Sequence, residues 1–269
     1  MNQQMNRSLQ LRLAVLVVVM VAPCLAVLSG TIAAGTDLIQ QPSADAERIR
    51  GIELYRQGDA NGAVEALRGA VKTNRDDAEA WHYLGLALLL KGSKDEARAA
   101  FEKAATIRLK DMAAASPISN TQDANARRLQ AAERYQAVID SFEQYLQITP
   151  NPTEDWISDL QALRFYRDYY SGLRSYETIV TTKEATVKLH ILSKPAPVFS
   201  GLRATGTAVL RALFGSDGTV KYVIVLHRVE SHFDQACIEA AKRIKFEPAF
   251  KDGRPVSMIL QLEYSRYQY

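Results

Sequence analysis

Side chains that commonly catalyse reactions or bind metals are sparse in this sequence of 269 residues. The four histidines are His82, His190, His227 and His232, and none lies in an HExxH pattern or near a CxxC pair that would indicate zinc. No GxSxG elbow, P-loop or GxGxxG turn occurs either. His227 and His232 flank one short loop, where solvent exposure is the commoner meaning and a metal or catalytic pair is the alternative. The sequence therefore predicts a protein that is not an enzyme and binds no metal or cofactor.

Cysteine chemistry is equally limited. The chain has two cysteines, and Cys24 lies in an apolar run, so no intramolecular disulfide framework is expected. Cys237 lies in SHFDQACIEAAKRI, where small and apolar residues recur at helical spacing on one face. No basic residue or histidine is placed to lower the pKa of this thiol, so we predict a packed core cysteine.

Backbone pairing is the chemistry that the C-terminal residues offer best. In the last apolar stretch Val256, Met258, Leu260, Leu262 and Tyr264 alternate with Ser257, Ile259, Gln261, Glu263 and Ser265. This period of two predicts a strand with one apolar and one largely solvated face. If it forms a sheet edge, its unpaired N–H and C=O groups can bind an extended segment of a partner protein. We therefore assign residues 256–264 as the partner-binding site, with affinity supplied mainly by the backbone.

The segment around this strand predicts an α+β domain with an antiparallel sheet over residues 185–269. Four stretches read as strands: ETIVTTKEATVKLHIL, TAVLRALFG, TVKYVIVLHRV and VSMILQLEYSRY. Asp217 and Gly218 predict a tight hairpin between the second and the third. A helix is expected at 232–243, with Ser231 as its N-cap and Asp234 as its capping partner.

Three parts of this segment together resemble the TonB C-terminal domain family. They are LSKPAPVF, GTAVLRALFGSDGTVKYVIVL and FDQACIEAAKRIKFEPAFKDGRPVSMILQLEY, in that order. The resemblance implies that Phe246 and Pro248 pack the helix against the sheet. It also implies a periplasmic protein that binds a segment of an outer-membrane receptor or transporter by strand addition. Transducers of this family pass energy to such transporters from an inner-membrane proton-driven complex.

An internal repeat organises the middle of the chain. Residues 47–80 align with 81–114 at a shift of 34, a period and pattern that resemble the tetratricopeptide repeat. The expected packing residues of this helical solenoid are Gly51, Ala63, Leu67, Trp81, Leu84, Gly85, Ala97 and Phe101. A third, weaker copy is expected in which Phe142, Val138 and Tyr145 take the roles of Phe101, Ala97 and Ala104, after a seven-residue insertion.

An apolar stripe on a helix at about 153–172 resembles the capping helix that a solenoid needs, so the repeat region is expected to span 47–172. Its tyrosines, among them Tyr166 and Tyr170, are expected in core or interdomain packing. The repeats would either bind a protein in their concave surface or serve as a rigid spacer. Residues 37–176 hold only four prolines and residues 13–36 no histidine, unlike the transducers. The alternative function is therefore a repeat-based scaffold or adaptor for assembly of a cell-envelope complex.

Residues 1–36 contain the apolar run LAVLVVVMVAPCLAVLSGTIAAGT, in which no side chain is ionisable. Residues 13–36 are long enough to cross a membrane, and Arg7 and Arg12 before them predict a cytoplasmic N-terminus. This favours a single-pass inner-membrane protein with residues 37–269 in the periplasm. A cleaved signal peptide and a lipid-modified Cys24 remain the alternatives, and all three export the rest of the chain.

The formal net charge of +3 is a sum of unlike parts. Residues 1–35 carry +2, residues 36–184 carry −4 and residues 185–269 carry +5. The basic residues are dispersed among acidic ones in an exported chain, so no nucleic-acid partner is expected. The predicted fold is an α+β multidomain chain: a transmembrane helix, an α-helical solenoid and a small TonB-like domain. A second copy of the chain, bound through the C-terminal domain, is a further candidate partner.

Overall fold

The computed structural model describes residues 43–114, 124–152, 154–173, 179–198 and 205–266. These residues belong to one compact unit that begins at Pro42. The predicted membrane segment 13–36 lies outside them. Among the residues that are described, no helix combines the length and the apolar character needed to span a bilayer.

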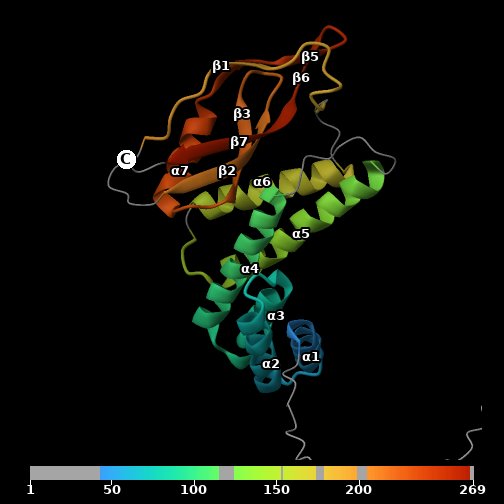
Figure 1. The fold of residues 1–269 in the computed structure, drawn as a ribbon, viewed down its shortest axis with the longest axis vertical. Helices are drawn as coiled ribbons and strands as arrows, with labels where there is room; N and C mark the ends of the chain where they lie inside the picture. The colour runs from blue at the N-terminus through green and yellow to red at the C-terminus, as the bar shows by residue number, and fades with distance from the viewer. Residues whose placement is uncertain (1–42, 115–123, 153, 174–178, 199–204, 267–269) are drawn as a thin grey trace, which may run out of the picture. The chain divides into compact units, whose positions relative to one another are not determined.

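The described part of the chain begins with two helical hairpins (Figure 1). They are α1 (Ala44–Arg56) with α2 (Ala60–Thr73), and α3 (Ala78–Lys91) with α4 (Lys94–Ala114). The side chains of Asp59 and Asp77 accept hydrogen bonds from the backbone N–H groups of Gly62 and Ala80, which caps α2 and α3. Gly92 ends α3 in the left-handed conformation, with φ of 87°. These features form the two helix pairs that the 34-residue repeat predicts.

The predicted third repeat is wrong in its local structure. A third copy would need a turn inside residues 124–148, but these residues form one continuous helix, α5 (Ala124–Ile148). The sequence there has no glycine at the position that corresponds to Gly92, so nothing ends the helix. Phe142 and Val138 are nevertheless buried, and α6 (Glu154–Ser171) packs against α5 where the capping helix was expected.

A three-stranded antiparallel sheet follows, built from β2 (Gly206–Phe214), β3 (Val220–His227) and β7 (Met258–Arg266). Its strand order is β3-β2-β7, so β2 is central and the other two are edges. The β2–β3 turn is closed by Asp217, whose carboxylate accepts from Thr219 and pairs with Lys221 at 2.7 Å. Hydrogen bonds from Lys221 and Thr219 lower the pKa of Asp217 to about 2. The hairpin lies where the sequence predicts it.

Helix α7 (Ser231–Lys242) covers one face of this sheet. Its N-cap is Glu230 and not Ser231, because the Glu230 side chain accepts from the backbone N–H of His232. Asp234 accepts from the N–H of Val229 instead of completing a capping box. The predicted capping residues are therefore wrong, although the helix itself is placed within one residue.

Four short strands make two small antiparallel pairs. β1 (His190–Ser193) pairs with β4 (Lys245–Glu247), and β5 (Ala249–Lys251) pairs with β6 (Arg254–Val256). The prediction of one long strand over 177–192 is wrong, because outside β1 the described residues form only single bridges, at Ile179 and Val187. Thr181 and Glu184 interrupt the extended chain by a local hydrogen-bonded turn.

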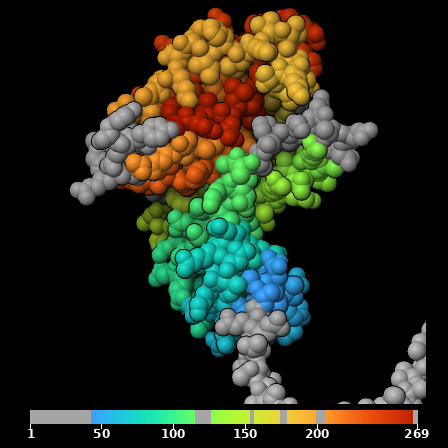
Figure 2. Space-filling view, viewed as in Figure 1, coloured from blue at the N-terminus to red at the C-terminus, as the bar shows by residue number. Residues whose placement is uncertain are grey.

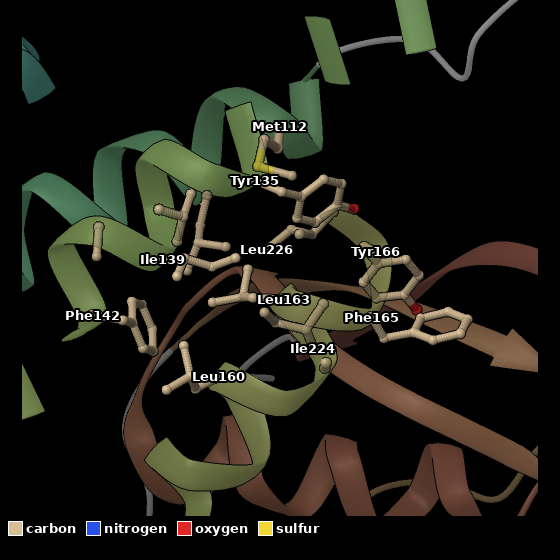
Figure 3. Packing of buried hydrophobic residues seen from close by; sticks show 14 of the residues in the cluster. Met112, Tyr135, Ile139, Phe142, Leu160, Leu163, Phe165, Tyr166, Ile224 and Leu226 are labelled. Carbon is tan, nitrogen blue, oxygen red and sulfur yellow. The ribbon is translucent and has the colours of Figure 1, made fainter. Parts of the chain in front are cut away.

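The three-stranded sheet separates two apolar cores. On one face, side chains including Leu210, Phe214 and Val225 pack beneath α7. On the other face, Leu213, Ile224 and Leu226 join one cluster with residues of α4, α5 and α6 (Figure 3). The last helices of the helical region thus cover the sheet directly, as predicted for Tyr166 and Tyr170.

Candidate partner-binding edge

The residues predicted to bind a partner lie at the end of β6 and along β7. Val256, Met258, Leu262 and Tyr264 are buried, whereas Gln261 and Glu263 are exposed. Two members of the expected solvated face depart from this pattern. Ile259 packs against the cluster shared with α4–α6, and Ser257 is fully buried and accepts a hydrogen bond from the N–H of Ser216 at 3.0 Å. Ile259 departs because this face of the sheet also carries a core, and Ser257 departs because its hydroxyl bonds to the β2–β3 turn.

The outer edge of β7 is occupied at its two ends. The backbone N–H of Val180 donates to the carbonyl of Ser257 at 3.0 Å, and Lys194 Nζ donates to the carbonyl of Glu263 at 2.8 Å. Backbone groups of alternate residues point to the same side of a strand, so Ile259 and Gln261 share this outer edge. Among the described residues no strand pairs with them there. As far as the described residues go, the stretch of edge between Ser257 and Glu263 has donors and acceptors that an added strand could use.

The opposite edge of the sheet is closed to an added strand. Tyr222 in β3 has a positive φ of 48°, and it sits in a bulge where two residues face one residue of β2. The hydroxyl of Tyr166 in α6 donates to the carbonyl of Tyr222 at 2.8 Å. The Phe165 ring also stacks on the Tyr222 ring, with centroids 3.9 Å apart. Because of the bulge and the contacts with α6, β3 lacks the regular row of outward N–H and C=O groups that strand addition requires.

Lys194 marks the C-terminal end of the open stretch. Its ammonium group lies 4.6 Å from the centroid of the Tyr264 ring, in addition to its bond to the Glu263 carbonyl. The Tyr264 hydroxyl is buried and has no described hydrogen-bond partner, and burial raises the pKa of Tyr264 to about 12.

Cys237 of α7 is fully buried, and burial raises the pKa of its thiol to about 12. This cysteine is therefore the packed core thiol that the sequence predicts.

The residues predicted to pack the repeats lie between paired helices. A Cβ atom on Gly51 would come within 2.5 Å of Leu67 Cγ, and one on Gly85 within 2.6 Å of Phe101 Cε1. The same close approach therefore recurs in both hairpins at the shift of 34. Ala63, Leu84 and Ala97 are buried beside these contacts, and Trp81 is partly buried, with its ring N–H donating to the carbonyl of Arg75 at 2.9 Å.

Two largely buried polar contacts have no signal in the sequence, one within the helical region and one between α5 and β2. Arg108 of α4 donates to Ser141 Oγ in α5 at 2.6 Å, and His82 Nδ1 lies 3.0 Å from the same hydroxyl. Burial, with a contribution from Arg108, lowers the pKa of His82 to about 4. Arg211 of β2 donates to the Tyr135 hydroxyl in α5 at 2.7 Å. These partners are 33 to 76 residues apart in the chain, a separation for which no local pattern gives a signal.

The remaining histidines do not gather into a site. His227 and His232 are exposed, and His190 lies 3.7 Å from the Glu247 carboxylate at the surface. Within the described ranges no group of three or more His, Cys, Asp or Glu side chains could hold a metal ion. The described part of the chain thus offers the β7 edge as its best-formed candidate site.

Comparison with known proteins agrees with the two resemblances. No curated protein matches this chain. Residues 50–115, which include both helical hairpins from within α1, match the family model described as tetratricopeptide repeat. Repeats of this kind are protein-interaction units, and the TonB family implies a protein of the Gram-negative envelope. Residues 201–265, which carry the three-stranded sheet and α7, match the family model described as Gram-negative bacterial TonB protein C-terminal, so this chain joins a tetratricopeptide segment to a TonB C-terminal segment.

Proposed function

We propose that this protein captures an extended segment of an envelope partner by adding it as a strand to the outer edge of β7. The partner class is an outer-membrane receptor or transporter segment, and the capture would serve energy transduction for transmembrane transport. In this proposal residues 13–36 anchor the chain in the inner membrane, while residues 47–172 and 185–269 act in the periplasm. An inner-membrane proton-driven complex would be the second partner.

The observation that carries the proposal is the asymmetry of the sheet. No described strand pairs with the outward backbone groups of Ile259 and Gln261 in β7, whereas β3 is bulged at Tyr222 and bonded to α6. Exposed edges invite non-specific pairing and are usually protected. An edge left open on one side of a sheet whose other edge is closed is typical of strand addition to a receptor sheet.

The alternative is a scaffold that assembles an envelope complex through its helical repeats. The tetratricopeptide match over residues 50–115 supports it, because such repeats bind proteins. Deleting residues 47–172 would not separate the two functions cleanly, since α4, α5 and α6 share a core with the sheet. Substitutions confined to the β7 edge make a cleaner test, since a repeat-based scaffold would still capture its partner when that edge is blocked.

The test is crosslinking in intact cells with a photoreactive amino acid at Gln261, whose side chain is exposed. We expect a crosslinked envelope partner, and we expect a full-length chain with Gln261→Pro and the photoreactive group moved to Glu263 to lose it. Proline removes the outward N–H and obstructs the ladder at that point. Gln261→Thr is the matched control, because it changes the side chain and keeps the backbone donor. Capture that survives Gln261→Pro in a folded protein would exclude strand addition at β7.

A further inference from the structure

The chain between Val187 and Ser193 forms a second sheet edge, separate from β7. Val187 exchanges both backbone hydrogen bonds with Phe250, at 2.9 and 3.1 Å, and β1 continues the antiparallel pairing through His190 opposite Glu247. Since Val187 faces inward, the alternate residues Lys188 and His190 turn their N–H and C=O groups outward. In the described part of the chain β1 has only β4 as a neighbour.

Apolar side chains are exposed along this edge. The exposed fractions are 55% for Val187, 38% for Ile191 and 58% for Leu192. The surrounding segment, residues 179–198, lies on the surface in the space-filling view (Figure 2). A strand edge with exposed branched side chains and free backbone groups is a surface that proteins normally cover or charge.

The charges around this edge are mainly basic, although the exposed carboxylate of Glu247 lies opposite His190. Lys188 and Lys194 lie in the segment itself, Lys245 is paired opposite Ser193, and Lys251 stands directly opposite Arg254 in the β5–β6 hairpin. Like charges directly opposite each other destabilise a strand pair, so the Lys251–Arg254 pairing is unfavourable in isolation. Among the described residues Lys188, Lys245 and Arg254 make no ion pair with an acidic side chain. Carboxylates on a partner would relieve this local excess of positive charge.

The combination of features discriminates between two kinds of partner. A basic surface with exposed apolar side chains also suits an anionic bilayer. Insertion into a bilayer would, however, leave the outward N–H and C=O groups of Lys188 and His190 without partners, which costs free energy. An extended peptide satisfies those backbone groups, covers Val187 and Leu192, and places acidic side chains near the lysines.

We propose that residues 187–193 are a second strand-docking edge, which binds an extended segment that alternates acidic and apolar residues. This edge has its own ladder beside the β7 edge, because the two strands lie in different sheets, although Lys194 directly after β1 bonds to the Glu263 carbonyl of β7. The protein would thus hold two extended segments at once, one on each sheet.

The test uses the full chain in neutral phosphatidylcholine nanodiscs and a fluorescent capped peptide of four Glu-Val repeats. Hydrogen exchange read by mass spectrometry should show slower exchange over residues 187–193 when the peptide is added. Fluorescence anisotropy should show binding that weakens about tenfold for His190→Pro, because the variant loses an outward donor and the ladder around it. His190→Thr is the matched control that keeps the donor, and Gln261→Pro should leave this binding unchanged. A Lys-Val peptide of the same length should bind at least about tenfold more weakly.

Several results would overturn the proposal. They are absence of peptide binding at millimolar concentration, protection confined to residues 259–263, or equal binding of the Glu-Val and Lys-Val peptides. Protection of residues 187–193 by anionic phosphatidylglycerol nanodiscs without peptide would assign the edge to lipid. Protection that grows with protein concentration without peptide would assign it to a second copy of the chain. The exchange measurement on the unsubstituted protein decides the question even if His190→Pro fails to fold.

Discussion

At the scale of single residues, the helical hairpins depend on two glycines whose missing Cβ atoms leave room for a large side chain. Gly51 makes room for Leu67 and Gly85 for Phe101. Glycine in a helix costs about 1 kcal/mol relative to alanine, so its use here reflects the close approach and not helix stability. The repeat alignment identified both glycines, since contacts inside a 34-residue unit recur at fixed spacing.

Gly85→Ala is expected to destabilise the full chain by about 1 to 3 kcal/mol. The added Cβ would lie 2.6 Å from Phe101 Cε1, so the packed ring must shift, and this outweighs the gain in helix propensity. Urea unfolding followed by circular dichroism measures the difference. Phe101→Leu replaces the ring with a smaller side chain. A double variant with Gly85→Ala and Phe101→Leu should therefore lose less stability than the sum of the two single losses.

Gly69→Ala in α2 is the matched control for this experiment. The atoms nearest to its Cβ would be those of the Glu47 carboxylate, the end of a flexible and partly exposed side chain. We expect no loss of stability and a gain of up to about 1 kcal/mol from helix propensity. If Gly69→Ala and Gly85→Ala destabilise the protein equally, close packing is not the reason for glycine at 85.

At the scale of elements, the sheet is held between helices on both faces, and the contact with α5 and α6 includes polar groups. Arg211 donates to the Tyr135 hydroxyl, and the Tyr166 hydroxyl donates to the Tyr222 carbonyl. The two bonds differ in charge. Arg211 is a largely buried cation whose other described partner is the Met112 carbonyl at 3.4 Å, whereas Tyr222 contributes a neutral acceptor.

Tyr135→Phe should therefore destabilise the protein more than Tyr166→Phe. Hydrogen bonds to buried charged groups contribute about 1.5 to 3 kcal/mol, and those between neutral groups about 1 kcal/mol. Both substitutions remove one hydroxyl and keep the ring, so each serves as the control for the other. Chemical unfolding of the two variants in parallel gives the comparison. Equal losses would mean that the Arg211 charge finds full compensation elsewhere.

The sequence predicts regular elements well and their exceptions poorly. The β2–β3 hairpin, α7 and the helix pairs follow from local patterns of turn residues and apolar spacing. The prediction of a turn within α5 was wrong because it depended on weak repeat similarity, and the sequence has no glycine there to end the helix. The N-cap of α7 moved to Glu230 because a side chain from the preceding loop reaches its first turn. Local propensity cannot predict which of two adjacent polar residues is the N-cap when tertiary packing determines the direction in which the chain enters the helix.

The strands around the candidate site were predicted in the same uneven way. Alternation along residues 256–264 identified β7, but the occupants of its outer edge, Val180 and Lys194, come from about 70 residues away. The bulge at Tyr222 also has no local signature, because its positive φ falls on a tyrosine and not on glycine. Which edge stays open is decided by contacts across the fold.

At the scale of the whole molecule, α4 links the two regions of the chain. Its first half, including Phe101, belongs to the core of the helical hairpins, and its second half, including Leu109, belongs to the core shared with the sheet. The tetratricopeptide segment and the TonB C-terminal segment are therefore joined through one helix, α4, whose two halves belong to two separate apolar clusters.

We expect the two regions to unfold in one cooperative transition. Trp156→Phe leaves Trp81 of α3 as the only tryptophan, and Cys24→Ser leaves Cys237 of α7 as the only thiol. In a chain with both substitutions, Trp81 fluorescence and reaction of Cys237 with a thiol reagent should change at the same urea concentration. Cys237 that becomes reactive while the Trp81 signal is still native would show that the sheet opens independently.

The bulge at Tyr222 has a consequence for assembly between copies of the chain. If β3 had a regular open edge, it could accept the β7 edge of another copy, and such head-to-tail contacts propagate without closure into fibres. Tyr222 has a left-handed backbone, and its carbonyl already accepts a hydrogen bond from Tyr166 of α6. Among the described residues, the β3 edge thus offers no regular ladder to the β7 edge of another copy, so we expect no head-to-tail stacking of the chain through these two edges.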